Sequence, residues 1–385
     1  MKQRYPALPV IWGGPGPTLE VEWCLQHADL VCTGEGEHLI VELDGTVIRN
    51  PNRPLLDLES VAIPDFEPAR TVHIGDDTLR RNVYPIFFGG RHYPIMTQRG
   101  CPFSCSFCIE SVYQDMFGKK NSLRRRSVDV VIEELVQAKQ RHGVRHVMFY
   151  DDVFTVNPRW LKEFAARYKR EVGLPFWCYT YPTTTRKEDI LLLKDAGLRS
   201  MTMGIQSGSE AMLGRFNRPV ARQKAIDAAR ILIECGVDAY FDLITKIDFE
   251  REEHCRETLE FLLDFPREMK SAGFGAMVSF PKYGYTATVA AEQAKPTLSQ
   301  RTYDFYHKLY LLTRTNVPRR VIASLARSRI ARRHPSLIDP LLPAQLPQFF
   351  LGDGGGEQAT PAVMDLPHAQ AVVPGGAADR RAAAS

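Results

Sequence analysis

The sequence predicts an α/β fold in which a partial (βα)6 barrel of the TIM type follows a partial doubly wound segment. From residue 93 to about residue 280, short apolar runs alternate with helical patterns at a period of about thirty residues. Six such units are fewer than the eight of a closed barrel. Before residue 45, a strand, a glycine-rich turn and a helix occur twice in succession, which is typical of a doubly wound sheet.

The N-terminal elements follow from their apolar runs and turn residues. We expect, in chain order, a strand at Leu8–Trp12, a helix at Leu19–Gln26 capped by Thr18, a strand at Asp29–Thr33 and a helix ending at Leu43. Glycine-rich turns after strands let a ligand approach the backbone closely, although tight turns in any α/β domain have the same composition.

The barrel elements have clearer signals. The strands are expected at Tyr93–Met96, Val144–Tyr150, Phe176–Tyr181, Ser200–Ile205, Val237–Thr245 and Phe274–Phe280. The helices between them are expected at Val128–Gln140, Pro158–Glu171, Lys187–Ala196, Ala221–Cys235 and Arg251–Phe265, with Ser127 and Asn157 as caps of the first two. Functional groups of such folds lie at the C-terminal ends of the strands.

Three cysteines follow the first barrel strand at C-x-x-x-C-x-x-C spacing, namely Cys101, Cys105 and Cys108. Three thiolates on one loop can bind three corners of a [4Fe–4S] cube, which leaves the fourth iron open to another ligand. The alternative is a structural zinc site, but zinc normally has four protein ligands. Since the other five cysteines are scattered, the pattern favours the cluster.

This spacing, with Phe107 before the third cysteine, resembles the radical S-adenosylmethionine (SAM) family. The resemblance implies that the open iron chelates the amino and carboxylate groups of SAM, and that the reduced cluster splits SAM into methionine and a 5′-deoxyadenosyl radical. It also implies a six-unit open barrel, a small-molecule substrate and an electron donor such as flavodoxin or ferredoxin.

Further motifs support the resemblance and assign side chains to SAM. Two aspartates after the second strand lie in a match to F-x-D-D-x-F-T-x-N, and alternation along a strand favours Asp152 as the inward one. A match to G-x-E-S-G-S has Gln206 in place of glutamate, which keeps the acceptor and loses the charge. Arg218, in L-x-x-x-x-R, suits the SAM carboxylate. With Phe107 these complete the expected SAM contacts, and no residue is assigned to catalysis itself. The alternatives are a capping pair of aspartates and a surface arginine.

The N-terminal turns resemble the second half of a cobalamin-binding domain, with "GG-x-x-P-T" and "GEGE" motifs over residues 5–45. The resemblance assigns to cobalamin the turn residues Gly13, Gly14, Gly34, Glu35 and Gly36. The first half of such a domain would lie upstream, so we expect this chain to bind cobalamin weakly or not at all. The expected domains are a partial cobalamin-binding domain at 1–50, a linker at 51–92, a radical SAM domain at 93–290, a C-terminal helical region at 291–350 and a disordered tail at 351–385.

Composition limits the class of protein. The chain has 385 residues, a net charge of +4 and eight cysteines, which in a chain this long are not a disulfide framework. No signal peptide or membrane span is evident, so we expect a cytoplasmic protein without a nucleic-acid partner. A basic amphipathic helix is expected at Arg319–Arg333. It could meet an acidic carrier, a membrane surface or RNA, but a solvated face over a domain is favoured.

The function expected from these features is that of a cobalamin-linked radical SAM enzyme. It would act on an unactivated carbon of a small-molecule metabolite, by methyl transfer, ring closure or rearrangement, as a transferase or an oxidoreductase or cyclase. The alternatives are a radical SAM enzyme without cobalamin and a non-catalytic binding protein on a degraded barrel. The intact cluster cysteines argue against the last of these.

Overall fold

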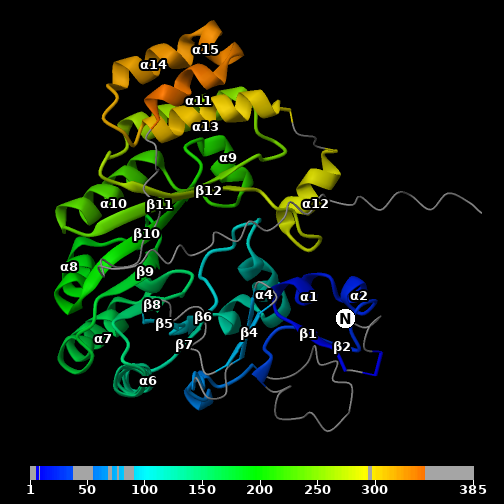
Figure 1. The fold of residues 1–385 in the computed structure, drawn as a ribbon, viewed down its shortest axis with the longest axis vertical. Coiled ribbons are helices and arrows are strands. Elements are labelled where there is room, and N and C mark those ends of the chain that lie inside the picture. Colours follow the sequence, from blue (N-terminus) through cyan, green and yellow to red (C-terminus); the bar gives the residue numbers. More distant parts are fainter. Residues whose placement is uncertain are drawn as a thin grey trace, which may run out of the picture. The chain divides into compact units, whose positions relative to one another are not determined.

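A computed structural model of the chain describes residues 6–7, 9–37, 55–67, 72–75, 78–81, 91–293 and 297–342. Its main sheet has six strands, all parallel, in the order β12-β11-β10-β9-β8-β5 (Figure 1). The strands are β5 (His92–Ile95), β8 (His146–Phe149), β9 (Phe176–Thr180), β10 (Leu198–Gln206), β11 (Asp238–Thr245) and β12 (Lys270–Ala276). This arrangement confirms the predicted α/β fold with a partial barrel.

Helices cover one face of this sheet (Figure 1). They are α6 (Val128–His142), α7 (Pro158–Glu171), α8 (Lys187–Ala196), α10 (Arg222–Glu234) and α11 (Glu252–Asp264). The predicted bounds of α7 and α8 are confirmed to the residue, and the clearest local signals are Asn157 with Pro158 at the start of α7 and Gly197 at the end of α8. The Ser127 hydroxyl accepts a hydrogen bond from Val130 N, and the Asn157 side chain accepts one from Trp160 N, so both predicted caps are confirmed.

The core lies between the sheet and these helices. Along β9, the side chains of Phe176 and Cys178 are fully buried in it. Because successive strand residues face opposite ways, Trp177 and Tyr179 lie on the other face of the sheet, inside the partial barrel. The same alternation between the two faces occurs on the neighbouring strands. It separates residues that stabilise the fold from residues that can line a site.

A second, small parallel sheet precedes the barrel. It consists of β1 (Ile11–Gly13) and β2 (Leu30–Cys32), with α1 (Pro15–Leu19) and α2 (Val21–Cys24) between them in the chain. The strand, helix, strand order agrees with the predicted doubly wound segment. A hairpin of β3 (Val72–Gly75) and β4 (Thr78–Arg81) lies in the stretch that was predicted as a linker. The predicted helix ending at Leu43 and the predicted tail at 351–385 lie outside the described residues.

The predicted N-terminal helix at Leu19–Gln26 is wrong in its bounds and in its cap. The helical region starts at Pro15, a residue whose fixed φ suits the first helical position. Thr18 therefore lies inside a helix instead of capping one. Its hydroxyl donates to Gly14 O at 2.8 Å and accepts from Gly34 N at 3.0 Å, so it joins the two glycine turns.

Two other predicted elements are corrected. The sixth strand runs from Lys270 to Ala276 instead of from Phe274 to Phe280, because it pairs with residues 240–245 of β11 despite its glycines. The basic stretch predicted as one helix forms α14 (Arg319–Arg327) and α15 (Arg329–Arg333). Ser328 separates them with an extended backbone, and its hydroxyl caps α15 by accepting from Ala331 N.

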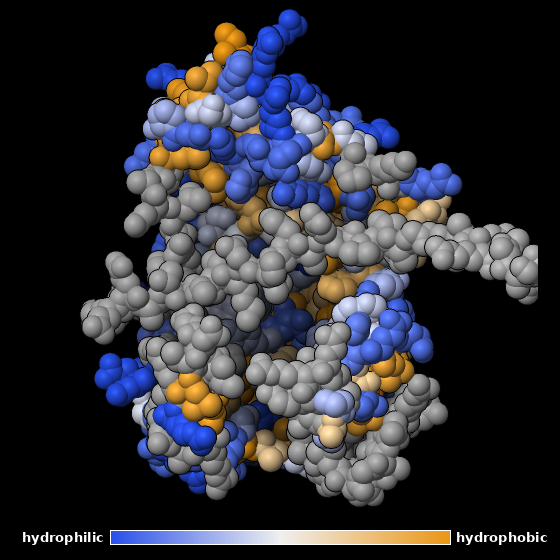
Figure 2. Space-filling view, turned by 45° about the vertical axis from the view of Figure 1, so that its right-hand side comes forward, coloured by the Kyte–Doolittle hydropathy of each residue, from blue (hydrophilic) through white to orange (hydrophobic). Residues whose placement is uncertain are grey.

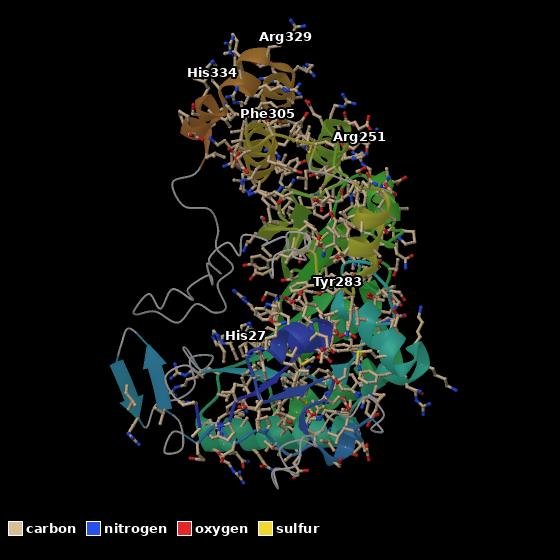
Figure 3. The ribbon with its side chains drawn as sticks, turned by 90° about the vertical axis from the view of Figure 1, so that its right-hand side faces the viewer. His27, Arg251, Tyr283, Phe305, Arg329 and His334 are labelled. Atoms are coloured by element: carbon tan, nitrogen blue, oxygen red, sulfur yellow. The ribbon has the colours of Figure 1, made fainter. Side chains whose placement is uncertain are left out.

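Helix α13 (Gln300–Leu312) packs on α11, and the 3-10 segment Pro335–Leu341 packs on α13. Helix α12 (Gly284–Ala291) lies elsewhere, with Gly284 and Tyr285 beside Ser106. Tyr310 donates to the carbonyl of Cys255 at 2.9 Å, and Phe305 of α13 is fully buried (Figure 3). Among the described helices, none has both the length and the apolar composition that a membrane-spanning segment needs.

Candidate functional site

A short loop carries the three cysteines from β6 (Gln98–Arg99) to α4 (Ile109–Phe117). The loop is fixed at its start because β6 pairs with β7 (Arg124–Arg125). Gly100 follows β6 with a φ of 86°, and a Cβ on it would lie 2.2 Å from the carbonyl oxygen of Ser122. Only glycine fits this position, so the turn requires Gly100 before the first cysteine.

Gln114 on α4 forms three hydrogen bonds to the cysteine loop. Its Nε2 donates to Cys101 O at 2.6 Å and to Phe103 O at 2.9 Å, while its Oε1 accepts from Ser104 Oγ at 2.6 Å. The side chain is buried, so these bonds replace water for three polar groups of the loop. Gln114 was not among the site residues predicted from the sequence. Its polar side chain on the buried face of a helix was the one available signal.

Other segments hold the loop from the opposite side. Ser106 N donates to Phe216 O at 2.9 Å, and the side chain of Asn217 donates to Ser104 O at 2.7 Å. Tyr285 N, at the start of α12, donates to Ser106 O at 2.9 Å. Segments more than 100 residues away in the sequence therefore determine the shape of the cysteine loop.

The thiols lie in a dry environment. Cys105 is buried, and Cys101 and Cys108 are half-buried. Burial, with smaller contributions from Asp152 and the neighbouring thiols, raises the pKa of Cys108 to about 12 and also raises the pKa of Cys101. Within the described part of the chain, no three His, Cys, Asp or Glu side chains are gathered closely enough to hold a metal ion.

Arg218 lies directly beside the loop. The residue is 6% exposed, and its guanidinium stacks over the ring of Tyr181, with 4.0 Å from Cζ to the ring centroid. One terminal nitrogen donates to Cys105 Sγ at 3.6 Å, and the other donates to Gly204 O at 2.6 Å. Its Nε has no hydrogen-bond partner among the described residues. Arg218 is thus a buried cation next to the thiols and not a surface arginine.

The two aspartates after β8 face opposite ways. Asp151 is fully buried and accepts from Thr97 Oγ1 at 2.8 Å. Asp152 is open to water on one side, but protein atoms crowd its other sides. Desolvation, followed by the charge of Asp151, raises its pKa to about 6. The charge of Asp152 in turn raises the pKa values of Cys101 and Cys108, so Asp152 is the aspartate that faces the loop.

Gln206 ends β10 with a φ of 71°, a conformation that non-glycine residues adopt rarely. Its Nε2 donates to Oδ1 of Asp242 on β11 at 3.2 Å. Burial raises the pKa of Asp242 to about 6, although the nearby charge of Arg218 opposes this. Asp242 was not among the site residues predicted from the sequence. The signal was its position between Phe241 and Leu243, whose burial in the core turns Asp242 to the inner face.

A small hollow lies at this end of β10. It is lined by Gly204, Ser207, Arg218, Pro182 and Phe261, among others. Figure 2 shows that the molecule is also hollowed at the middle of one face.

Phe107 packs within an apolar cluster under the loop. Its ring meets that of Phe216 edge-on at a centroid distance of 4.9 Å. The same cluster contains Val112 of α4, Leu19 of α1 and Tyr283, which lies where α12 begins (Figure 3). The described position of Phe107 is that of a packed ring, and its cluster joins the N-terminal segment to the barrel.

The two glycine turns of the N-terminal segment lie at one edge of its sheet. A Cβ on Gly13 would lie 3.4 Å from Cβ of Cys32, and one on Gly36 would lie 4.0 Å from Sγ of the same residue. A Cβ on Gly14 would meet no atom within 4 Å among the described residues. Gly34 has a φ of 74°, and a Cβ there would lie 2.8 Å from the ring of Phe117, so this glycine lets α4 approach the turn.

Glu35 in the second turn points toward the cysteine loop. Its carboxylate forms an ion pair with Arg99 at 2.7 Å and another with Arg124, and it accepts from Leu56 N at 2.8 Å. The structure thus brings together Asp152, Arg218, Gln206 and the three cysteines at one end of the sheet. Glu35 and the apolar cluster around Phe107 connect the glycine turns to that group.

A family model described as "Radical SAM superfamily" matches residues 95–262, which hold the cysteine loop, Asp152, Gln206 and Arg218. The chain belongs to the radical SAM superfamily. It is 29% identical over 278 residues to an uncharacterized methyltransferase of Pyrococcus horikoshii, covering 66% of this chain and 57% of the relative. It is 28% identical over 283 residues to the anaerobic magnesium-protoporphyrin IX monomethyl ester cyclase of Cereibacter sphaeroides, covering 67% and 45% respectively. The chain thus spans about half the length of these curated relatives.

Solved structures share the fold of this radical SAM protein. The methyltransferase TsrM of Kitasatospora setae, solved with tryptophan and a SAM analog, superposes with a TM-score of 0.56 at 18% identity, covering 74% of this chain and 58% of TsrM. The cobalamin-dependent SAM radical enzyme OxsB, solved with aqua-cobalamin and SAM, superposes with a TM-score of 0.54 at 15% identity, covering 84% and 58%.

Membership of the radical SAM superfamily implies a [4Fe–4S] cluster and SAM as cofactors. The donor set fits such a cluster in its chemistry. The three thiols lie on one loop that hydrogen bonds hold in place. Thiols bind a metal as thiolates, and three thiolates are what a [4Fe–4S] cluster with one open iron needs. Arg218 lies against Cys105, so its positive charge would partly offset the negative charge of a cluster held there.

Proposed function

We propose that this chain forms the catalytic core of a cobalamin-using radical SAM enzyme that acts on an unactivated carbon of a small-molecule metabolite. The observation that carries the proposal is the convergence of the cysteine loop, Asp152 and Arg218 at the same end of the parallel sheet. The transformation we favour is methyl transfer, since the relatives include methyltransferases, and ring closure or rearrangement is the alternative, since they also include a cyclase.

Each side chain has a role that its surroundings support. Cys101, Cys105 and Cys108 hold three irons of the cluster. The buried guanidinium of Arg218 binds the carboxylate of SAM, and its Nε is still unpartnered among the described residues. Asp152 accepts from the amino group of SAM on the side where it is open to water. When bound and reduced, the cluster supplies the electron that splits SAM into methionine and a 5′-deoxyadenosyl radical.

Gln206 and Asp242 lie at the same end of the sheet and would add polar groups to the SAM site. Asp242 accepts a hydrogen bond from the amide Nε2 of Gln206, which would leave Oε1 to accept from a hydroxyl or amino group of SAM, since no described residue donates to it. Phe107 supports the loop from behind rather than contacting SAM polar groups. Phe103, Tyr181 and Arg218 form a stack beside Cys105, in which the first two rings lie 3.8 Å apart.

Cobalamin is proposed from the relatives and from the place of the glycine turns. TsrM and OxsB were each solved with cobalamin, and both share this fold. In this chain Gly13, Gly14, Gly34 and Gly36 lie at one edge of the small sheet, where backbone can approach a ligand, with the Glu35 backbone among them. Cobalamin bound there would supply the methyl group and would lie close to the cysteine loop.

The test is an anaerobic assay of 5′-deoxyadenosine release with a chemical reductant. The reconstituted chain is expected to release it, and the Cys101→Ala, Cys105→Ala, Cys108→Ala triple variant is expected to release none and to lose its iron. Cys235→Ala, which removes a buried thiol far from the loop in sequence, is the control and should behave as the wild type. Wild-type iron content in the triple variant would exclude the cluster assignment.

Equilibrium dialysis with hydroxocobalamin separates the proposal from its rival, a radical SAM enzyme without cobalamin. Weak binding, as expected of the second half of the domain, that is lost on Gly36→Val with 5′-deoxyadenosine release unchanged would support cobalamin use. If no binding is detected while SAM is cleaved, the rival is the better description of this chain. Reduced flavodoxin or ferredoxin can then replace the chemical reductant to identify the electron donor.

A further inference from the structure

The carboxylate of Glu35 connects the N-terminal segment to the strand pair that begins the cysteine loop. Its Oε1 receives a guanidinium nitrogen of Arg99 at 2.7 Å and one of Arg124, and its Oε2 accepts from Leu56 N at 2.8 Å. The side chain is only 12% exposed. Both oxygens are therefore already in use, which leaves neither for a ligand.

The two arginines are cross-strand neighbours. Arg99 ends β6 and pairs with Arg124 of β7 in the antiparallel register. Like charges directly opposite each other on paired strands repel, and here the two side chains are only 29% and 21% exposed. Arg124 also donates to Leu56 O at 2.5 Å, but that carbonyl carries no charge. Glu35 is the carboxylate that contacts both cations.

Charges in this group balance. Glu37 also pairs with Arg99, so two carboxylates face two guanidinium groups. Burial alone would raise the pKa of Glu35, but the bonds from Arg124, Leu56 and Arg99 lower it below the usual range. Glu35 is therefore fully ionised at neutral pH. Cys101 follows Arg99 by two residues, so this balance is maintained next to the first cluster ligand.

We propose that Glu35 is a positioning residue of the cysteine loop, which holds the ends of β6 and β7 together and keeps the charge beside the cluster neutral. The second effect sets the reduction potential, because an added positive charge nearby favours the reduced, more negative cluster. The same turn contains Gly34 and Gly36, so a ligand that moves this turn changes the potential through Glu35. The inference depends on the proposed cluster, although not on cobalamin.

The first experiment compares reconstituted wild type, Glu35→Gln and the double variant Glu35→Gln/Arg124→Gln by a redox titration followed by electron paramagnetic resonance. Glu35→Gln leaves one uncompensated cation, and the midpoint potential is expected to shift to a more positive value. The double variant removes a cation as well and should return toward the wild-type potential. Glu234→Gln, which breaks an exposed pair with Lys187, is the matched control and should not shift it.

A purely structural role for Glu35 predicts a different result. In that case the double variant, which loses more contacts, would be no closer to the wild type than Glu35→Gln. That outcome, or an unchanged potential in Glu35→Gln at wild-type iron content, would overturn the inference.

If Glu35→Gln fails to take up iron, Glu35→Asp keeps the charge and is expected to take up the cluster and to retain the wild-type potential. A Glu35→Asp protein that also loads no iron would overturn the charge effect. A wild type that takes up no cluster would refute the proposed function instead.

Discussion

Replacement of Gln114 by alanine tests whether the cysteine loop is held in shape by side chains outside the cysteine motif. The substitution removes three hydrogen bonds at once, to Cys101 O, Phe103 O and Ser104 Oγ. A typical net contribution is about 1 kcal/mol for each, and the partners in the loop are shielded from water. The expected loss is therefore about 3 kcal/mol in the free energy that holds the loop in its described shape.

This loss has two measurable consequences. The chain without cluster should unfold at lower denaturant concentration with an unchanged m value, since the change is local. The reconstituted chain should lose iron to a chelator faster than the wild type, because the loop opens more often. Gln137→Ala is the matched control, since Gln137 bonds only to Glu133 on the exposed face of α6. Iron loss at the same rate in Gln114→Ala and Gln137→Ala would refute the argument.

Four further outcomes are expected. Arg218→Ala should weaken SAM binding by about 1.5–3 kcal/mol with iron content retained, and an isothermal titration that finds equal affinity would return Arg218 to a packing role. Asp152→Asn should also weaken SAM binding while Asp151→Asn mainly lowers stability, as a SAM titration and thermal unfolding would separate. Gly100→Ala should prevent cluster uptake, measured as iron per chain, because its Cβ would clash with Ser122 O. The pKa of Asp242 is raised to about 6 from a usual 3.8, so the folded chain loses stability as pH rises from about 4 to 6 and this buried group ionises. The free energy of unfolding of Asp242→Asn, measured in urea, should therefore increase relative to that of the wild type over this range, by at most about 3 kcal/mol.

Much of the barrel could be predicted from the sequence because its signals are local. Helix α7 begins at Pro158 after the Asn157 cap, and the apolar periodicity of a helix or strand is visible within a window of a dozen residues. The spacing of Cys101, Cys105 and Cys108 is also local. Errors occurred where local signals conflict with pairing, as in β12, whose glycines hid a strand that its neighbour β11 extends.

Tertiary structure decided which polar groups meet. Glu35 lies 64 residues from Arg99 and 89 from Arg124, and Gln206 meets Asp242 across two neighbouring strands. The periodicity of the sequence does not predict such contacts, because they depend on which strands become neighbours and on the face of the sheet from which each side chain projects. The sequence by itself determined the fold class and the ligand motif of this radical SAM protein. The packing of distant segments determined how the loop is braced and which charges lie beside it, since electrostatic and hydrogen-bond energies depend on distance in space and not on distance along the chain.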